Sequence, residues 1–208
     1  MIRNAVGGSQ RHDLANVADI AVAAGLAKGT VYLYFQSKEE IYLALHLRHM
    51  EHFLTTLIER LNSATPFHFS EMAALANEYI LESSNYLPLG ACCIGFAAGA
   101  VPPASTEYFQ SRLTDWLETA GAGLERHFPK LPTGEGARLL NHSYAFMVGL
   151  HSLMRNEPGN DLKCAQIKGT GSFQEETLLA LTRYWTQVAG IEVTINAHDG
   201  KPQERNKK

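Results

Sequence analysis

Residues 28–38 of this 208-residue chain hold a close cluster of side chains that can donate hydrogen bonds. The members are Lys28, Thr30, Tyr32, Tyr34 and Lys38. Ammonium, hydroxyl and phenol groups of this kind suit the phosphate oxygens and base edges of a nucleic acid. Gly29 lies among them, and a residue without a Cβ lets the backbone approach a ligand closely. In the alternative interpretation, the two tyrosines only cover the edge of an apolar core.

Two short helices and a tight turn are needed to position this cluster. Small and branched apolar residues recur at helical spacing before it, at Val17, Ile20, Ala21 and Ala24. Gly25 can take the left-handed conformation that ends a helix, and Leu26 is expected to fill the corner. A second helix over 28–35 turns Val31 and Phe35 inward and leaves the donors outside. A small residue, a glycine turn and a buried anchor at this spacing predict a helix-turn-helix.

The start of the next helix is a predicted phosphate site. Ser37 can cap this helix, and Glu40 can close a capping box with it. The free backbone N–H groups of the first turn, the helix dipole and the ammonium of Lys38 together favour a phosphate oxygen. Asn16 stands at the corresponding cap position of the first short helix.

The segment Ala24–Leu45, AGLAKGTVYLYFQSKEEIYLAL, resembles the DNA-binding head of the tetracycline-repressor (TetR) family of bacterial regulators. The resemblance implies that the second short helix enters the major groove and that Lys38 grips a phosphate. It gives the groove-facing role to Lys28, Gly29, Thr30, Tyr32 and Tyr34. It also implies a homodimer that binds a palindromic operator in double-stranded DNA and is released by a small-molecule effector.

The first sixteen residues, MIRNAVGGSQRHDLAN, differ from the family pattern, in which a long amphipathic helix supports the recognition unit. Gly7, Gly8 and Ser9 interrupt a helix here, because glycine costs about 1 kcal/mol per helical position relative to alanine. We expect either a short, irregular helix or a native N-terminus that this sequence has lost. The alternative function is therefore a TetR-like dimer that has lost operator binding and keeps only ligand or protein binding.

Charge and hydropathy agree with a small head on a larger body. The chain is 45% apolar, which allows a substantial core, and its net charge is -3. Residues 1–48 hold five basic and four acidic residues, so the head has a net charge of +1 and neutralises few phosphates. Useful affinity then needs two subunits. No secretory signal is visible and the apolar stretch Leu89–Val101 is too short to span a bilayer, so we expect a cytoplasmic protein without membrane contact.

The spacing of apolar residues predicts an all-α fold with three parts. These are a helix-turn-helix DNA-binding head at 1–48, a helical ligand-binding and dimerisation body at 49–196, and a disordered polar tail at 197–208. Apolar residues recur at helical spacing in segments 39–61, 72–83, 109–124, 135–156 and 173–189. The last two resemble the pair of helices with which the family forms a four-helix dimer interface.

Several side chains of the body are candidates for a ligand cavity, although residues of these types at helical spacing equally build a plain core. They are Tyr79, Phe96, Trp116, Tyr144, Met147 and His151. His46, His49 and His52 spread too widely around one helix to share a metal ion, so no metal or other cofactor is expected. The competing class is an enzyme built on the helical body, with Cys93 as nucleophile or a histidine as base. Because no set of base, nucleophile and orienting group can be placed from the spacing, we do not expect catalysis.

Overall fold

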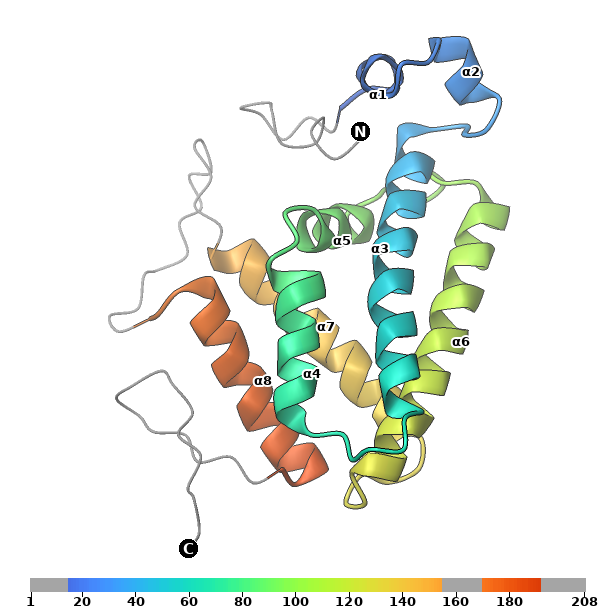
Figure 1. Ribbon diagram of the computed structural model, residues 1–208. Coiled ribbons are helices and arrows are strands. Elements are labelled where there is room, and N and C mark those ends of the chain that lie inside the picture. The colour runs from blue at the N-terminus through green and yellow to red at the C-terminus, as the bar shows by residue number, and fades with distance from the viewer. Residues whose placement is uncertain (1–14, 155–169, 192–208) are drawn as a thin grey trace, which may run out of the picture.

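The computed structural model describes residues 15–154 and 170–191. Every regular element within these two ranges is a helix, which confirms the all-α prediction (Figure 1). A small head lies at one end of a larger helical body. The predictions of an irregular N-terminus at Gly7, Gly8 and Ser9 and of a disordered tail at 197–208 lie outside the described residues.

The head consists of α1 (Val17–Ala24) and α2 (Lys28–Tyr32). Asn16 caps α1 as predicted, because its Oδ1 accepts hydrogen bonds from two backbone N–H groups of the first turn at 2.9 and 3.1 Å. Gly25 ends α1 in the left-handed conformation with a φ of 69°. Val31 of α2 is buried against α1, so the predicted helix-turn-helix spacing is confirmed.

Two details of the head differ from the sequence prediction. Helix α2 ends at Tyr32 rather than at residue 35, because the N–H groups of Leu33 and Tyr34 bond to carbonyls three residues earlier and tighten the chain into a turn. Leu26 does not fill the corner between the helices, since its side chain is 50% exposed. The buried Ala21 and Val31 occupy that space instead.

A long helix, α3 (Lys38–Leu61), joins the head to the body and confirms the predicted segment 39–61. Ser37 caps it as predicted, with its Oγ accepting the N–H of Glu40 at 3.1 Å. Its head-proximal residues Ile41 and Tyr42 are buried in the core of the head, whereas five apolar residues nearer its C-terminus are buried in the core of the body, namely Met50, Phe53, Leu54, Leu57 and Leu61. One helix therefore belongs to both cores.

The body is built from the remaining helices around α3 (Figure 1). They are α4 (Phe69–Ala76), the π-helical turn η2 (Asn77–Leu81), α5 (Tyr86–Ile94), α6 (Pro103–His127), α7 (Glu135–Met154) and α8 (Phe173–Ala189). Helices α7 and α8 agree with the predicted segments 135–156 and 173–189 over the described residues. Helix α5 was not predicted, because Pro88 and the glycines after it read as breakers. Pro88 is tolerated in the first turn of α5, where its missing N–H has no partner to lose.

Helices α6 and α7 meet backbone to backbone near the end of the body that is far from the head. A Cβ at Gly136 would collide with the backbone of Gly121, and a Cβ at Gly121 would collide with the backbone of the first turns of α7. Only glycine fits at either position, and this pair fixes how closely the two helices pack.

The core of the head extends into the body. Leu89 of α5 is buried with Val17, Ile20 and Val31, and Phe96 packs against the same cluster. The head therefore rests on the C-terminal end of α5 as well as on α3, and residues outside the predicted head help to hold it in place.

Candidate nucleic-acid interface

The predicted donors of α2 lie on the outside of the head. The side chains of Tyr32 and Tyr34 are 49% and 76% exposed, and Lys28 and Gly29 are also exposed, while Thr30 is half-buried. The ammonium of Lys28 stands 5.8 Å from the centre of the Tyr32 ring, which places a charge and a phenol side by side. Neither tyrosine belongs to the core of the head, so both phenols are open to a partner.

Lys38 occupies the first position of α3, at the same end of the molecule as α2 (Figure 1). Its side chain is 40% exposed, and its Nζ lies 3.9 Å from the Oε1 of Glu39. The cap by Ser37 satisfies the N–H of Glu40, whereas the N–H groups of the first two positions precede the helical hydrogen-bond ladder and point out of the helix end. An anion at this end would meet those N–H groups and the ammonium of Lys38.

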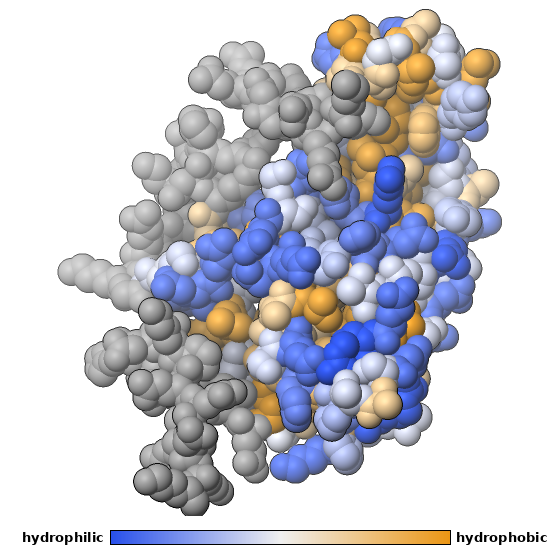
Figure 2. All heavy atoms as spheres, viewed as in Figure 1, coloured by the Kyte–Doolittle hydropathy of each residue, from blue (hydrophilic) through white to orange (hydrophobic). Residues whose placement is uncertain are grey.

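Exposed apolar side chains gather over the head. Figure 2 shows them over α1 and α2, and they include Val22 and Leu33, each 80% exposed, beside Tyr34. The sequence analysis did not single out Val22 and Leu33. The helical spacing could have indicated that both are exposed, because neither belongs to the inward-facing positions of α1 and of the predicted second helix. This end of the molecule therefore presents methyl and ring groups among the hydrogen-bond donors.

Residues 13–45 match the family model described as bacterial regulatory proteins, tetR family. The chain carries a TetR-family DNA-binding domain. The match spans α1, α2 and the first turns of α3, so it contains every donor of the 28–38 cluster. The match supports a DNA-binding transcriptional regulator of this family. A comparison with curated proteins found no match.

The body core includes or contacts three of the predicted ligand-cavity residues that come from α6 and α7, namely Trp116, Tyr144 and Met147. Trp116 is buried beneath the guanidinium of Arg112, which sits 4.5 Å from the ring centre. Met147 is buried in the same core. The hydroxyl of Tyr144 lies 2.9 Å from the Nε2 of His46. Of these three side chains, Tyr144 is the one whose polar group contacts another buried side chain.

Of the other three predicted ligand-cavity residues, Tyr79 also packs against the body core. The ring of Tyr79 faces His52 at 5.0 Å, and that of His151 meets the edge of Phe173 at 5.5 Å. Phe96 packs against the core of the head and not against that of the body. The structure therefore does not bring Phe96 together with the rest of the predicted set.

The three histidines of α3 have different environments. His46 is 2% exposed, His49 faces the ring of Tyr86 and His52 is exposed. Burial, and then the neighbouring His49, lower the pKa of His46 to about 4, so this imidazole is neutral at neutral pH. A side chain at Gly90 would collide with the Tyr144 hydroxyl, so that glycine leaves the room for the contact with His46.

The two described cysteines are poor nucleophiles. Cys92 and Cys93 are free and partly buried at the end of α5. Burial raises the pKa of the Cys93 thiol to about 12 and also raises that of Cys92, so very little reactive thiolate exists at neutral pH. Among the residues that the structure describes, no helix is long and apolar enough to cross a membrane.

Proposed function

We propose that this TetR-family chain is a homodimeric repressor that binds a palindromic operator through two heads and is released by a small-molecule ligand. The observation that carries the proposal is the joint placement of the donors of α2 and the capped N-terminus of α3 at one exposed end of the molecule. As a regulator of bacterial operator DNA, it would act in the cytoplasm.

In the proposed complex, α2 lies in the major groove. Lys28, Gly29 and Thr30 lie in the first turns of α2 and approach the bases and the backbone, and the phenols of Tyr32 and Tyr34 donate to phosphates. Lys38 and the first N–H groups of α3 bind a further phosphate. Few of these contacts distinguish one base from another, so the palindrome is read by two heads together.

A second copy of the chain is proposed to cover α7 and α8. Support comes from large apolar side chains that remain exposed there, with Phe146 at 43%, Leu153 at 59% and Leu178 at 41%. The ring of Phe146 packs edge-on against Tyr184 at 5.1 Å, so the two helices already share one aromatic surface. A two-fold dimer through this surface would present both heads, at a spacing of about 34 to 36 Å for adjacent major grooves.

The effector is proposed to act on the body, where Tyr79, Trp116, Tyr144, Met147 and His151 are the candidate contacts. A ligand releases DNA only if it binds the released form more tightly than the DNA-bound form. A preference of about 5.5 kcal/mol moves the population from 1:99 to 99:1. Binding that is equally tight in both forms changes nothing.

Fluorescence anisotropy with duplex DNA from upstream of the chain's own gene tests the proposal. We expect saturable, sequence-selective binding that is abolished by Tyr32→Ala and by Lys38→Ala. In binding that remains at low salt, Lys38→Ala should reduce the slope of log K against log salt by about 0.9 per head, whereas Tyr32→Ala removes no charge and should leave the slope unchanged. Tyr108→Ala and Lys130→Ala are matched controls, because both residues are exposed on the body. A dimer that binds no DNA even at low salt would contradict the proposal and leave the alternative of ligand or protein binding alone.

A further inference from the structure

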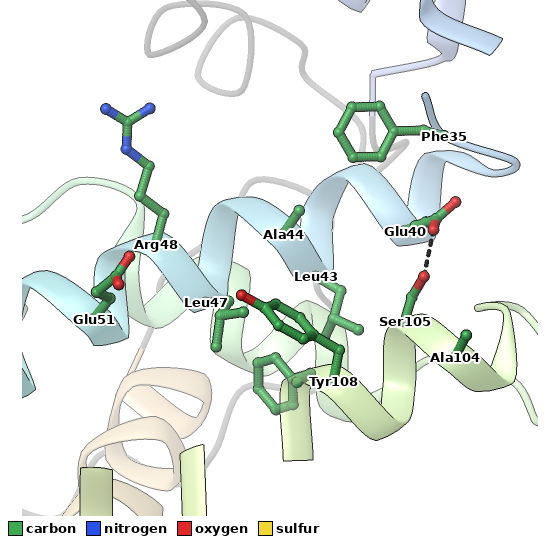
Figure 3. Close-up of a pocket in the computed structure, with 11 residues that line it drawn as sticks. Phe35, Glu40, Leu43, Ala44, Leu47, Arg48, Glu51, Ala104, Ser105 and Tyr108 are labelled. Atoms are coloured by element: carbon green, nitrogen blue, oxygen red, sulfur yellow. Dashed lines mark hydrogen bonds between the residues drawn. The ribbon is translucent and has the colours of Figure 1, made fainter. Parts of the chain in front are cut away.

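The turn between α2 and α3 is tied to the body through the carboxylate of Glu40. One oxygen, Oε2, accepts the backbone N–H of Gln36 in the turn at 2.6 Å. The other, Oε1, accepts the hydroxyl of Ser105 in the first turn of α6 at 2.5 Å (Figure 3). The sequence predicted that Glu40 closes a capping box on Ser37. In the structure this carboxylate instead bridges the head and the body.

A second side chain makes a parallel bridge. The Oγ of Ser37 accepts the N–H of Glu40 at 3.1 Å and donates to the carbonyl of Ala100 at 2.9 Å. Ser37 and Glu40 thus each bond once to the turn or the start of α3 and once to the segment 100–105. We call these four hydrogen bonds the latch. Its head side carries Lys38, which lies between Ser37 and Glu40 in the chain.

A groove of about 520 Å³ runs beside the latch between α3 and α6. Leu43, Leu47 and Phe109 line it with carbon, and Glu40 and Ser105 lie at its head-proximal end (Figure 3). Phe109 of α6 also stacks against His46 of α3, so side-chain packing holds the two helices together at this level. The hydrogen bonds of the latch add a second tie at the head-proximal end, and their partly buried surroundings strengthen them relative to bonds in water.

We propose that Glu40 and Ser105 are positioning residues, which hold the DNA-reading turn at a fixed place relative to the body through the latch. A movement of the start of α6 would then move the turn through these hydrogen bonds, and no bending of α3 would be needed. The effect on DNA rests on the proposed function, whereas the latch itself is a property of the free protein. The two can therefore be tested separately.

Hydrogen exchange of the DNA-free protein tests the latch. We expect Glu40→Ala and Ser105→Ala to increase amide exchange in peptides covering 33–40 by about fivefold, as expected for loss of a bond of about 1 kcal/mol. Glu39→Ala removes the same charge from the same helix turn, and Ser111→Ala makes the same change at an exposed site on α6, so neither should increase exchange. Exchange that is equal in the test and control variants would overturn the latch.

Operator affinity tests the positioning role. Loss of the latch should weaken DNA binding, whereas the loss of a negative charge alone should strengthen it. Glu39→Ala and Glu40→Ala each remove a negative charge beside a phosphate site, so charge alone tightens binding in both. The latch predicts that Glu40→Ala and Ser105→Ala instead weaken it about fivefold, with the double variant no weaker than Glu40→Ala. Increased exchange with unchanged affinity would overturn the positioning role. Absence of operator binding by the unaltered chain would overturn the proposed function, and the exchange result would still decide the latch.

Discussion

The buried imidazole of His46 makes the stability of the body depend on pH. Its pKa is about 4 in the folded chain and near 6.5 in an unfolded one. Between these values the unfolded state binds the proton first, so the free energy of unfolding falls as pH is lowered. At about 1.4 kcal/mol per pH unit, the loss is about 2 kcal/mol by pH 5 and about 3 kcal/mol below pH 4. Above pH 6.5 this contribution is fully retained.

The surroundings of His46 offer no compensation for a charge. Its Nε2 faces the hydroxyl of Tyr144, and its Nδ1 is buried without a hydrogen-bond partner among the described residues. The rings of Tyr86 and Phe109 pack against it, and the neighbouring His49 disfavours a proton on it. An imidazolium here would be both desolvated and unpaired.

Urea unfolding at a series of pH values, followed by far-UV circular dichroism, measures this effect. His46→Gln keeps a polar group of similar reach and removes the titration. Between pH 7 and pH 4, the free energy of unfolding of this variant should therefore fall by about 3 kcal/mol less than that of the unaltered chain. His52→Gln is the matched control on the exposed side of α3 and should follow the unaltered chain. If the His46→Gln and unaltered curves run parallel, the neutral buried imidazole is the wrong explanation.

Four further substitutions test the packing and the backbone. Gly136→Ala should cost at least about 2 kcal/mol in urea unfolding, because the methyl group meets the backbone of α6, whereas Gly149→Ala has open space and should gain up to about 1 kcal/mol. Gly25→Ala should lower stability by about 1 to 2 kcal/mol because of its φ of 69°, visible as a lower Tm. Ser143→Ala leaves the buried indole N–H of Trp185 without its 2.9 Å partner, so tryptophan-monitored unfolding should show a loss of about 1 to 3 kcal/mol. Equal stability of Gly136→Ala and Gly149→Ala would contradict the close-contact explanation.

The head could be predicted from the sequence because its signals are local. Asn16, Gly25 and Ser37 each act within one turn of their own position, and a cap or a left-handed glycine has the same meaning in any fold. The end of α2 was less predictable. Periodicity places Phe35 inward, and it does pack against the core, but the chain reaches that position through a turn rather than through a helix.

Contacts between distant segments could not be predicted in this way. Glu40 has the spacing of a capping-box residue, and only the fold shows that Ser105, far along the chain, competes for its carboxylate. Helix α5 was hidden because Pro88 and Gly90 are usually breakers. Pro88 is tolerated because it lies in the first turn of α5, whereas the reason for Gly90 is tertiary, because it leaves space for Tyr144.

None of the predicted ligand-cavity residues lines the groove, for a related reason. Aromatic and methionine side chains were chosen by type, and type does not distinguish filled from open space. Trp116 and Met147 are buried in the core. The open space lies between Leu43, Leu47 and Phe109, at a level of α3 and α6 where the periodicity of either helix alone predicts only an ordinary packed face.

The glycine contact between α6 and α7 lies near one end of α6, so a tilt of α6 about this contact would displace its other end the most. Gly121 and Gly136 pin the two backbones together at the far end of the body, and Ser105 lies sixteen residues away, close to the head. At 1.5 Å per residue the arm between them is about 24 Å long. A tilt of about 5° at the pinned end therefore carries the Ser105 hydroxyl about 2 Å along its arc, which is more than a hydrogen bond can stretch. A small tilt about the contact between Gly121 and Gly136 would thus be enough to break the hydrogen bond between Ser105 and Glu40 at the opposite end of the same helix.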